Sequence, residues 1–365
     1  MLSSVKAKAL EFYEKNETKV DLGFFLGGFV FDIFTLSSID DPFSIAQQVA
    51  YLLIIGLFLY HDFLLKCGKW QPSPRWQTIW NYRSLIVHFL LGSLLSVYSL
   101  FYLKSSSIFS SIVFVVVLLI LMVANELKQI QRSEVNIKIA LYVICLFSFY
   151  SLIVPVALGF VGWVPFLLSI SFTALTLGLV FKKLQSKVQD SQTLLRFLMA
   201  PTAGVLSLFL VFYYFGWIPP VPISINNMGV YHDLEVINST WNLKYERPWY
   251  KFWQSGAQDF IARPGDRVLF FVQIYSPSRF DDGVILDWAR YDDKRGWLRS
   301  DRIPIRIVGG RKEGFRGYTY KQNFTDGQWR VKVETTDGRE IGRLHFDVTK
   351  TDEVLDQREW KVDTF

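Results

Sequence analysis

The sequence contains only two cysteines among its 365 residues, Cys67 and Cys145, and both precede Pro219. The part of the chain that follows Pro219 therefore has no disulfide bond and is expected to fold around its own hydrophobic core. No CxxC pair and no Cys/His spacing typical of zinc sites is present. We expect neither a metal nor another cofactor.

Motifs that carry well-known chemistry are also missing. The sequence has no G-x-S-x-G, no P-loop, no dinucleotide-binding fingerprint, no H-E-x-x-H and no kinase signature. The acidic pairs Asp281-Asp282 and Asp292-Asp293 lack EF-hand spacing and are predicted to be turn residues. These absences favour a protein that is not an enzyme, and we assign no catalytic residue.

Charge is scarce in the first part of the chain. Overall the sequence is 51% hydrophobic and 17% aromatic, with a mean hydropathy of +0.23. Before Pro219 there are 16 Lys and Arg and 11 Asp and Glu, whereas the remainder has 23 and 22. The excess of basic residues therefore belongs to the apolar part, and no basic surface for nucleic acid is expected.

The part of the chain before Pro219 contains several long apolar runs. A helix needs roughly 20 mainly apolar residues to cross a bilayer, because its backbone polar groups must be satisfied internally. We expect about seven transmembrane helices, near 22–38, 44–65, 82–103, 106–124, 136–159, 161–181 and 197–217. The fifth and sixth are nearly continuous, so the segment from Pro155 to Pro165 could instead form a broken or re-entrant turn.

The placement of Lys and Arg predicts the orientation, since cytoplasmic loops retain these residues. Alternate loops hold all but one of the sixteen cations before Pro219: Lys6, Lys8, Lys15, Lys19, Lys66, Lys69, Arg75, Arg83, Lys128, Arg132, Lys138, Lys182, Lys183, Lys187 and Arg196. The other loops hold only Lys104. We expect a multi-pass protein of a bacterial inner membrane, with residues 1–21 in the cytoplasm, 22–217 in the bilayer and the C-terminal part in the periplasm.

The C-terminal part is predicted to be all-β. Pro219, Pro220 and Pro222 favour an extended spacer. Period-two alternation predicts short strands near 268–275, 284–291, 303–308, 315–324, 328–335 and 340–348. Asp337-Gly338 between two alternating runs indicates a hairpin. We expect a linker at 218–230, an immunoglobulin-like β-sandwich at 231–350 and a tail at 351–365.

A resemblance supports this prediction. The stretch FRGYTYKQNFTDGQWRVKVETTDGREIGRLHFDV, residues 315–348, contains G-x-W-x-V-x-V, a D-G turn and a final G-R-x-x-F-x-V strand. It resembles the C-terminal part of the bacterial domain of unknown function 2914. That family often has a histidine two residues before the tryptophan of the preceding strand, whereas this chain has Leu286-Asp287-Trp288. The resemblance implies a module that faces the cell envelope, and no activity follows from it.

Polar residues within the apolar runs are the first candidates for a site. Asp32 lies within the first expected span, at a depth where an ionised group is costly, level with Gln47 and Gln48 of the second. These residues predict either a hydrogen-bonded clasp between helices or a proton or ion site. A second set, His61, Asp62 and His88, could bind a metal or move a proton, or could simply lie at the membrane interface.

Tryptophans of the C-terminal part are the second candidates. Trp297 follows the charged turn that includes Arg295, so we predict that these two residues contact a ligand. Trp249 and Trp253 recur at helical spacing in ERPWYKFWQ, which predicts either an interfacial helix or an aromatic core strand.

Two functions remain open on this basis. The first is a non-enzymatic membrane protein whose β-sandwich binds a protein, glycan or lipid of the envelope, besides the lipid bilayer itself. The second is a membrane-embedded enzyme or transporter of a lipid or small solute that uses the intramembrane Asp and His residues.

Overall fold

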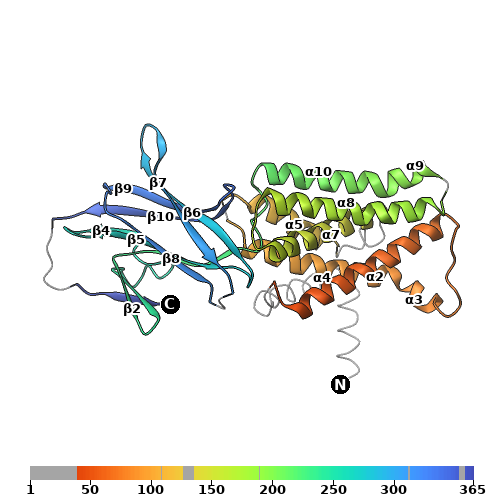
Figure 1. Cartoon of the computed structure of the whole chain (residues 1–365), viewed down its shortest axis with the longest axis horizontal. Helices are drawn as coiled ribbons and strands as arrows, with labels where there is room; N and C mark the ends of the chain where they lie inside the picture. Colours follow the sequence, from red (N-terminus) through yellow and green to blue (C-terminus); the bar gives the residue numbers. More distant parts are fainter. Residues whose placement is uncertain (1–38, 108, 126–134, 189, 311–312, 353–357) are drawn as a thin grey trace, which may run out of the picture. The chain divides into compact units, whose positions relative to one another are not determined.

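The computed structural model describes residues 39–107, 109–125, 135–188, 190–310, 313–352 and 358–365. The chain forms two compact units, one of helices and one mainly of strands (Figure 1). The helical unit includes Ile112–Val154 and Val164–Ile218. The second unit combines Pro219–Phe365 with two short segments from the helical part of the sequence, Lys104–Ser111 and Pro155–Trp163.

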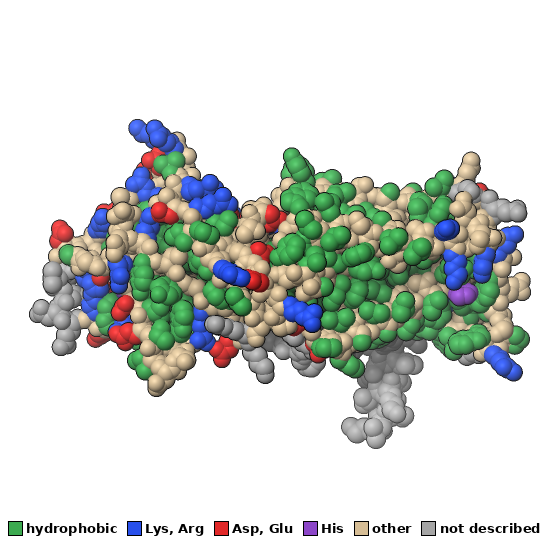
Figure 2. Space-filling view, viewed as in Figure 1, with side chains coloured by type: hydrophobic (Ala, Val, Ile, Leu, Met, Phe, Trp, Pro, Cys, Tyr) green, Lys and Arg blue, Asp and Glu red, His purple; other side chains and the backbone are tan. Residues whose placement is uncertain are grey.

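The helical unit follows the apolar runs closely. Its helices are α2 (Pro42–Lys66), α3 (Gln77–Asn81), α4 (Arg83–Lys104), α5 (Ile112–Asn125), α7 (Val135–Leu158), α8 (Trp163–Gln185), α9 (Ser191–Leu194) and α10 (Ala200–Tyr214), with one π-helical turn (Leu195–Met199) before α10. Within the described residues, five helices are long and apolar enough to cross a membrane, counting Gln192–Tyr214 as one. On the face shown in Figure 2, hydrophobic side chains cover these helices, as expected for surfaces that face lipid.

The expected number of seven spans is not established. The expected span 22–38, with Asp32, lies outside the described residues. The expected span 106–124 is a helix of only 14 residues, because α5 begins at Ile112. Before it, the backbone N–H groups of Ser110 and Ser111 donate to the carbonyl oxygen of Ser107. Serine favours such turns over helix interiors, since its hydroxyl competes for backbone hydrogen bonds.

The segment between Pro155 and Pro165 is a tight connection between two separate helices. Helix α7 ends at Leu158 and α8 begins at Trp163. Gly159 and Gly162 adopt φ angles of 81° and 139°, which residues with a Cβ rarely adopt. The two glycines thus allow the chain to reverse within four residues.

The second unit is an all-β sandwich with a small third sheet. Its strands are β1 (Ser224–Tyr231), β2 (Asp233–Ile237), β3 (Thr240–Tyr245), β4 (Asp259–Ala262), β5 (Val268–Tyr275), β6 (Asp281–Asp292), β7 (Gly296–Val308), β8 (Phe315–Lys321), β9 (Gly327–Thr335), β10 (Glu340–Lys350) and β11 (Lys361–Thr364). The three sheets have the orders β1-β5-β8, β4-β10-β9-β6-β7 and β11-β3-β2. The hairpin predicted at Asp337-Gly338 is confirmed, because it joins the antiparallel pair β9 and β10.

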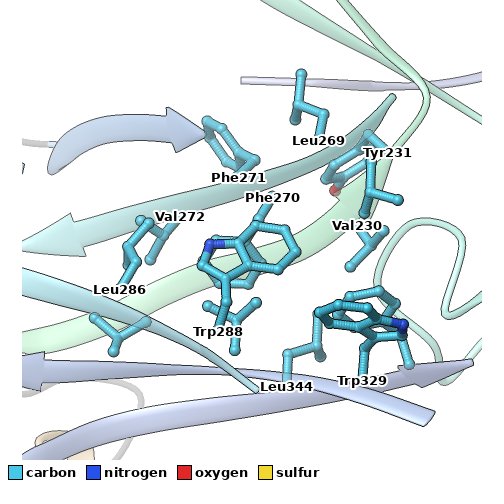
Figure 3. Close-up of a cluster of buried hydrophobic side chains, with 14 of the residues drawn as sticks. Val230, Tyr231, Leu269, Phe270, Phe271, Val272, Leu286, Trp288, Trp329 and Leu344 are labelled. Atoms are coloured by element: carbon cyan, nitrogen blue, oxygen red, sulfur yellow. The ribbon is translucent and has the colours of Figure 1, made fainter. Parts of the chain in front are cut away.

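The core lies between the first two sheets. Figure 3 shows Trp288 of β6 and Trp329 of β9 among side chains that include Phe270 and Val272 of β5. Val268–Ile274 of β5 is buried throughout, so its alternating side chains are covered on both faces. At roughly 25 cal/mol per Å² of apolar surface, burial of these aromatic residues is the main favourable contribution to folding of this unit.

Two expected boundaries differ from the observed strands. Strand β1, Ser224–Tyr231, occupies much of the segment expected as a linker, where it pairs with β5. Strand β11 lies in the segment expected as a tail and pairs with β3. Both strands pair with partners distant in the sequence, which local alternation cannot reveal.

Candidate functional site

A cleft of about 300 Å³ opens on the sandwich at the edge formed by β4, β10 and β9. Its floor comes from the adjacent strands β9 and β10, where Gln328 pairs with Asp347. One wall is Trp297 at the start of β7, and the opposite wall is the segment that leads into β4. The lining residues are Gln254, Gln258, Asp259, Trp297, Gln328, Trp329, His345, Phe346 and Asp347.

Turn chemistry positions Trp297. The carboxylate of Asp292 accepts hydrogen bonds from the backbone N–H groups of Lys294 and Arg295, at 3.0 and 2.9 Å. Gly296 then adopts a φ of 73°, so the chain reverses and Trp297 pairs across the hairpin with Tyr291. The indole is half-buried, and its orientation is set before any ligand arrives.

Neighbours of Trp297 hold one side of its ring. The guanidinium of Arg330 lies over the indole, 4.4 Å from its centroid. The imidazole of His345 lies 5.3 Å away, centroid to centroid, and inclined by 58°. Arg330 and His345 are cross-strand partners on the outward face of β9 and β10. Trp297 therefore packs onto this pair and presents its remaining surface to the cleft.

Hydrogen bonds order the opposite wall. The carboxylate of Asp259 accepts from the amide nitrogen of Gln254 at 2.9 Å and from the ammonium of Lys251 at 2.6 Å. The backbone N–H of Asp347 donates to the carbonyl oxygen of Gln258 at 2.8 Å, next to the parallel pairing of β4 with β10. Among the described residues, the buried amide oxygen of Gln254 has no hydrogen-bond partner.

The cleft is lined by two carboxylates, and the cations Lys251 and Arg330 lie beside it. Hydrogen bonds from Lys251 and then Gln254 lower the pKa of Asp259. Burial, followed by the nearby charges of Arg343 and Arg330, lowers the pKa of His345, so its imidazole is neutral. The cleft thus offers carboxylate and amide oxygens as hydrogen-bond acceptors beside an indole.

Of the residues predicted on the β domain, Trp297 lines the cleft. Arg295 is exposed in the adjacent turn and does not line it. Trp249 and Trp253 are 84% and 67% exposed in the loop that precedes Gln254. That loop contains turns, so it is neither the interfacial helix nor the core strand that we considered.

The other lining residues were not predicted as site residues from the sequence. His345 and Asp347 alternate with buried Leu344 and Phe346 in β10. This alternation was visible in the sequence and would have placed His345 and Asp347 on the outward face. Gln254 carried no such signal because it lies in an irregular loop, and Asp259 begins β4, a strand of only four residues.

The polar residues predicted within the membrane do not converge. Asp62 forms an ion pair with Arg83 at 2.8 Å, while the Nδ1 atom of His61 lies 2.9 Å from the carbonyl oxygen of Leu57. His88 is buried, and its Nδ1 atom lies 3.1 Å from the amide oxygen of Asn125. No group of three or more metal-ligating side chains occurs among the described residues.

The two glutamines of α2 have different surroundings. The amide nitrogen of Gln47 donates to the hydroxyl of Tyr51 at 2.8 Å within the helix, and its side chain is exposed. Gln48 is buried. Their expected partner, Asp32, lies outside the described residues.

Comparisons with solved structures give weak likenesses. An immunoglobulin-like protein from Pseudomonas aeruginosa is 14% identical, with a TM-score of 0.22, and the match covers 35% of this chain and 98% of that protein. A Pseudomonas fluorescens alkylpurine DNA glycosylase, bound to DNA with an abasic site analogue, is 10% identical, with a TM-score of 0.22 and coverage of 86% and 100%. Similarity this low supports no argument about fold or function.

Comparisons of sequence are more specific. Among curated proteins, no relative matches the chain. The family model described as protein of unknown function (DUF2914) matches residues 281–348, from β6 to most of β10. The match includes Trp297, Gln328, His345 and Asp347 of the cleft. It confirms that the C-terminal region of this chain carries the DUF2914 resemblance read from its strand and turn motifs.

Proposed function

We propose that this chain is an integral protein of a bacterial inner membrane whose β domain lies in the periplasm and binds a component of the envelope through the Trp297 cleft. The five long apolar helices support membrane insertion. The cation distribution supports the orientation, since fifteen of the sixteen Lys and Arg residues before Pro219 fall in alternate loops.

The cleft is the observation that carries the binding role. Ligand sites are concave, largely pre-formed and lined by aromatic residues with a few positioned polar groups. The Trp297 cleft fits this description, because hydrogen bonds and ring contacts fix both of its walls. A membrane-embedded enzyme or transporter finds less support in the described residues, since His61, Asp62 and His88 contact different partners.

Photocrosslinking of the full chain in living cells tests this function. A photoreactive phenylalanine analogue is placed at position 297, and in a matched control at position 318. Tyr318 of β8 is an exposed aromatic residue that does not line the cleft. We expect a discrete adduct at position 297 alone, which mass spectrometry identifies as protein, glycan or lipid. Equal adducts at both positions, or none at position 297, would contradict the proposal.

A further inference from the structure

We infer that the Trp297 cleft recognises an uncharged saccharide of one or two rings. This inference rests on the proposed function and narrows its partner to one chemical class. A volume of about 300 Å³ lies at the lower end of the range of small-molecule sites. Such a cleft holds a short segment of a ligand, not a folded protein surface.

The composition of the lining separates a saccharide from a lipid or an apolar peptide. Among the nine lining residues there are three amides, two carboxylates, one imidazole and the half-buried indole of Trp297, and no aliphatic side chain. The remaining two, Trp329 and Phe346, have side chains that are buried in the core of the sandwich. An acyl chain or a Leu-rich peptide would require aliphatic contacts. A sugar ring instead places its C–H groups against an indole and its hydroxyls against planar polar groups, which this lining supplies.

The hydrogen-bonding state of the lining favours a ligand that donates hydrogen bonds. The amide oxygen of Gln254 is a buried acceptor without a partner among the described residues. The carboxylate of Asp347 also has no hydrogen bond or ion pair there, whereas that of Asp259 is held by Gln254 and Lys251. A buried acceptor that lacks a partner is unfavourable, and the exposed carboxylate of Asp347 can accept a hydrogen bond from a ligand hydroxyl directly.

Charge favours an uncharged ligand, because the cations Lys251 and Arg330 beside the cleft offset its two carboxylates. Asp259 and Asp347 lie on paired positions of β4 and β10, so both carboxylates border the same side of the cleft. The neutral His345 adds no positive charge. A phosphate or carboxylate ligand would meet the carboxylate of Asp347, whereas the hydroxyls of an uncharged sugar would not be repelled by it.

Paired backbone forms part of the floor of the cleft. Residues 328–329 and 345–347 belong to β9 and β10, which already pair with each other. On its other side β10 pairs with β4, from Asp347 onward. A peptide that extends the sheet needs unpaired backbone groups at an edge. Where the backbone is paired in this way, recognition depends on side chains.

Calorimetric titration of the full chain in lipid nanodiscs tests the inference. The probes are N,N′-diacetylchitobiose, cellobiose and maltose, with inorganic phosphate as the anionic comparison. We expect saturable binding of at least one disaccharide and none of phosphate. Trp297→Ala and Gln254→Leu should each weaken binding about tenfold or more. Trp297→Phe should bind more tightly than Trp297→Ala, because it keeps an aromatic ring. The control Tyr318→Ala should bind the disaccharide as tightly as the unmodified chain.

Three outcomes would overturn the inference. They are absence of binding of all three disaccharides up to about 10 mM, binding that Trp297→Ala does not weaken, and preferential binding of phosphate. The photocrosslinking experiment shows whether such an outcome rejects only the saccharide or also the proposed binding function. A protein or lipid adduct at position 297 without disaccharide binding rejects the saccharide and leaves the binding role standing, whereas absence of any adduct rejects both.

Discussion

His232 shows at the residue scale how a buried titratable group makes the β domain sensitive to acid. Its side chain is only 2% exposed and stacks on Phe260 with ring centroids 4.0 Å apart. Burial lowers its pKa from 6.5 to about 4, although the nearby carboxylates of Asp266 and Glu246 act in the opposite direction. The folded domain therefore holds this imidazole neutral at pH values where an unfolded chain protonates it.

This arrangement predicts a loss of stability between pH 6.5 and pH 4. The contribution of neutral His232 to the free energy of unfolding is complete above the pKa of the unfolded state. It is lost as the pH falls through the pKa of the folded state, and the free energy of unfolding decreases by up to roughly 3 kcal/mol. We expect His232→Phe to flatten this part of the curve of unfolding free energy against pH. The measurement is urea denaturation of the full chain in nanodiscs at stepwise pH, followed by near-ultraviolet circular dichroism. Identical curves for both proteins would contradict the prediction.

Residue chemistry predicted Trp297 better than it predicted the rest of the cleft. The charged turn before Trp297 indicated that the indole would not lie in the core, and hydrogen bonds from the turn to Asp292 account for its position. Gln254 and Asp259 reach the same cleft because β4 pairs with β10 at Asp347 and because Gln254 donates to Asp259. Single-residue patterns contain no information on such contacts, so a complete site was beyond sequence analysis.

At the scale of elements, local alternation predicted the second half of the sandwich and missed the first. Strands β5, β6, β9 and β10 were predicted because buried and exposed side chains alternate in them or form short apolar runs. Strand β1 was missed because its burial does not alternate; its last three residues are buried in sequence. The pairing of β11 with β3 joins segments more than a hundred residues apart, which depends on the closed fold.

The pairing of β11 with β3 predicts that β11 protects the backbone amides of β3 from hydrogen exchange. Phe365 exchanges two backbone hydrogen bonds with Trp241, at 2.8 and 3.0 Å, and its ring lies 4.9 Å from that of Phe271. Deleting residues 361–365 removes this ladder and an aromatic contact with the core. We expect amide hydrogen exchange of Thr240–Tyr245 to accelerate at least about tenfold, a change of 1.4 kcal/mol or more in the local opening free energy.

A conservative variant provides the control for this deletion. Thr364 is exposed, so Thr364→Ala removes one weak side-chain contact while the backbone ladder remains. Its exchange rates on β3 should match those of the unmodified chain. Unchanged protection in the deleted chain would show that β2 and the sandwich hold β3 without β11.

At the scale of the whole molecule, the β domain includes two short segments from the apolar part of the sequence. Hydropathy alone would assign these segments to the helical unit. Segments 104–111 and 155–163 connect long helices, yet they group with the β domain. Ser107 hydrogen-bonds to the carboxylate of Glu340, and the backbone N–H of Val161 donates to that of Asp282 at 3.1 Å. These connections include Lys104, the single exception to the cation bias. The cation-poor loops 104–111 and 155–163 and the β domain thus form one unit, as the proposed orientation requires.

Single-cysteine labelling can test this arrangement, since cations favour the cytoplasmic side. Ser186 lies in a loop flanked by Lys182, Lys183 and Lys187, whereas Ser300 is exposed in β7. In a chain freed of native thiols by Cys67→Ser and Cys145→Ala, we expect Ser300→Cys to react with an impermeant maleimide in intact spheroplasts. Ser186→Cys should react only after lysis, because the bilayer shields the cytoplasmic loop. The reverse pattern would place the Trp297 cleft in the cytoplasm and would remove the basis for an envelope ligand.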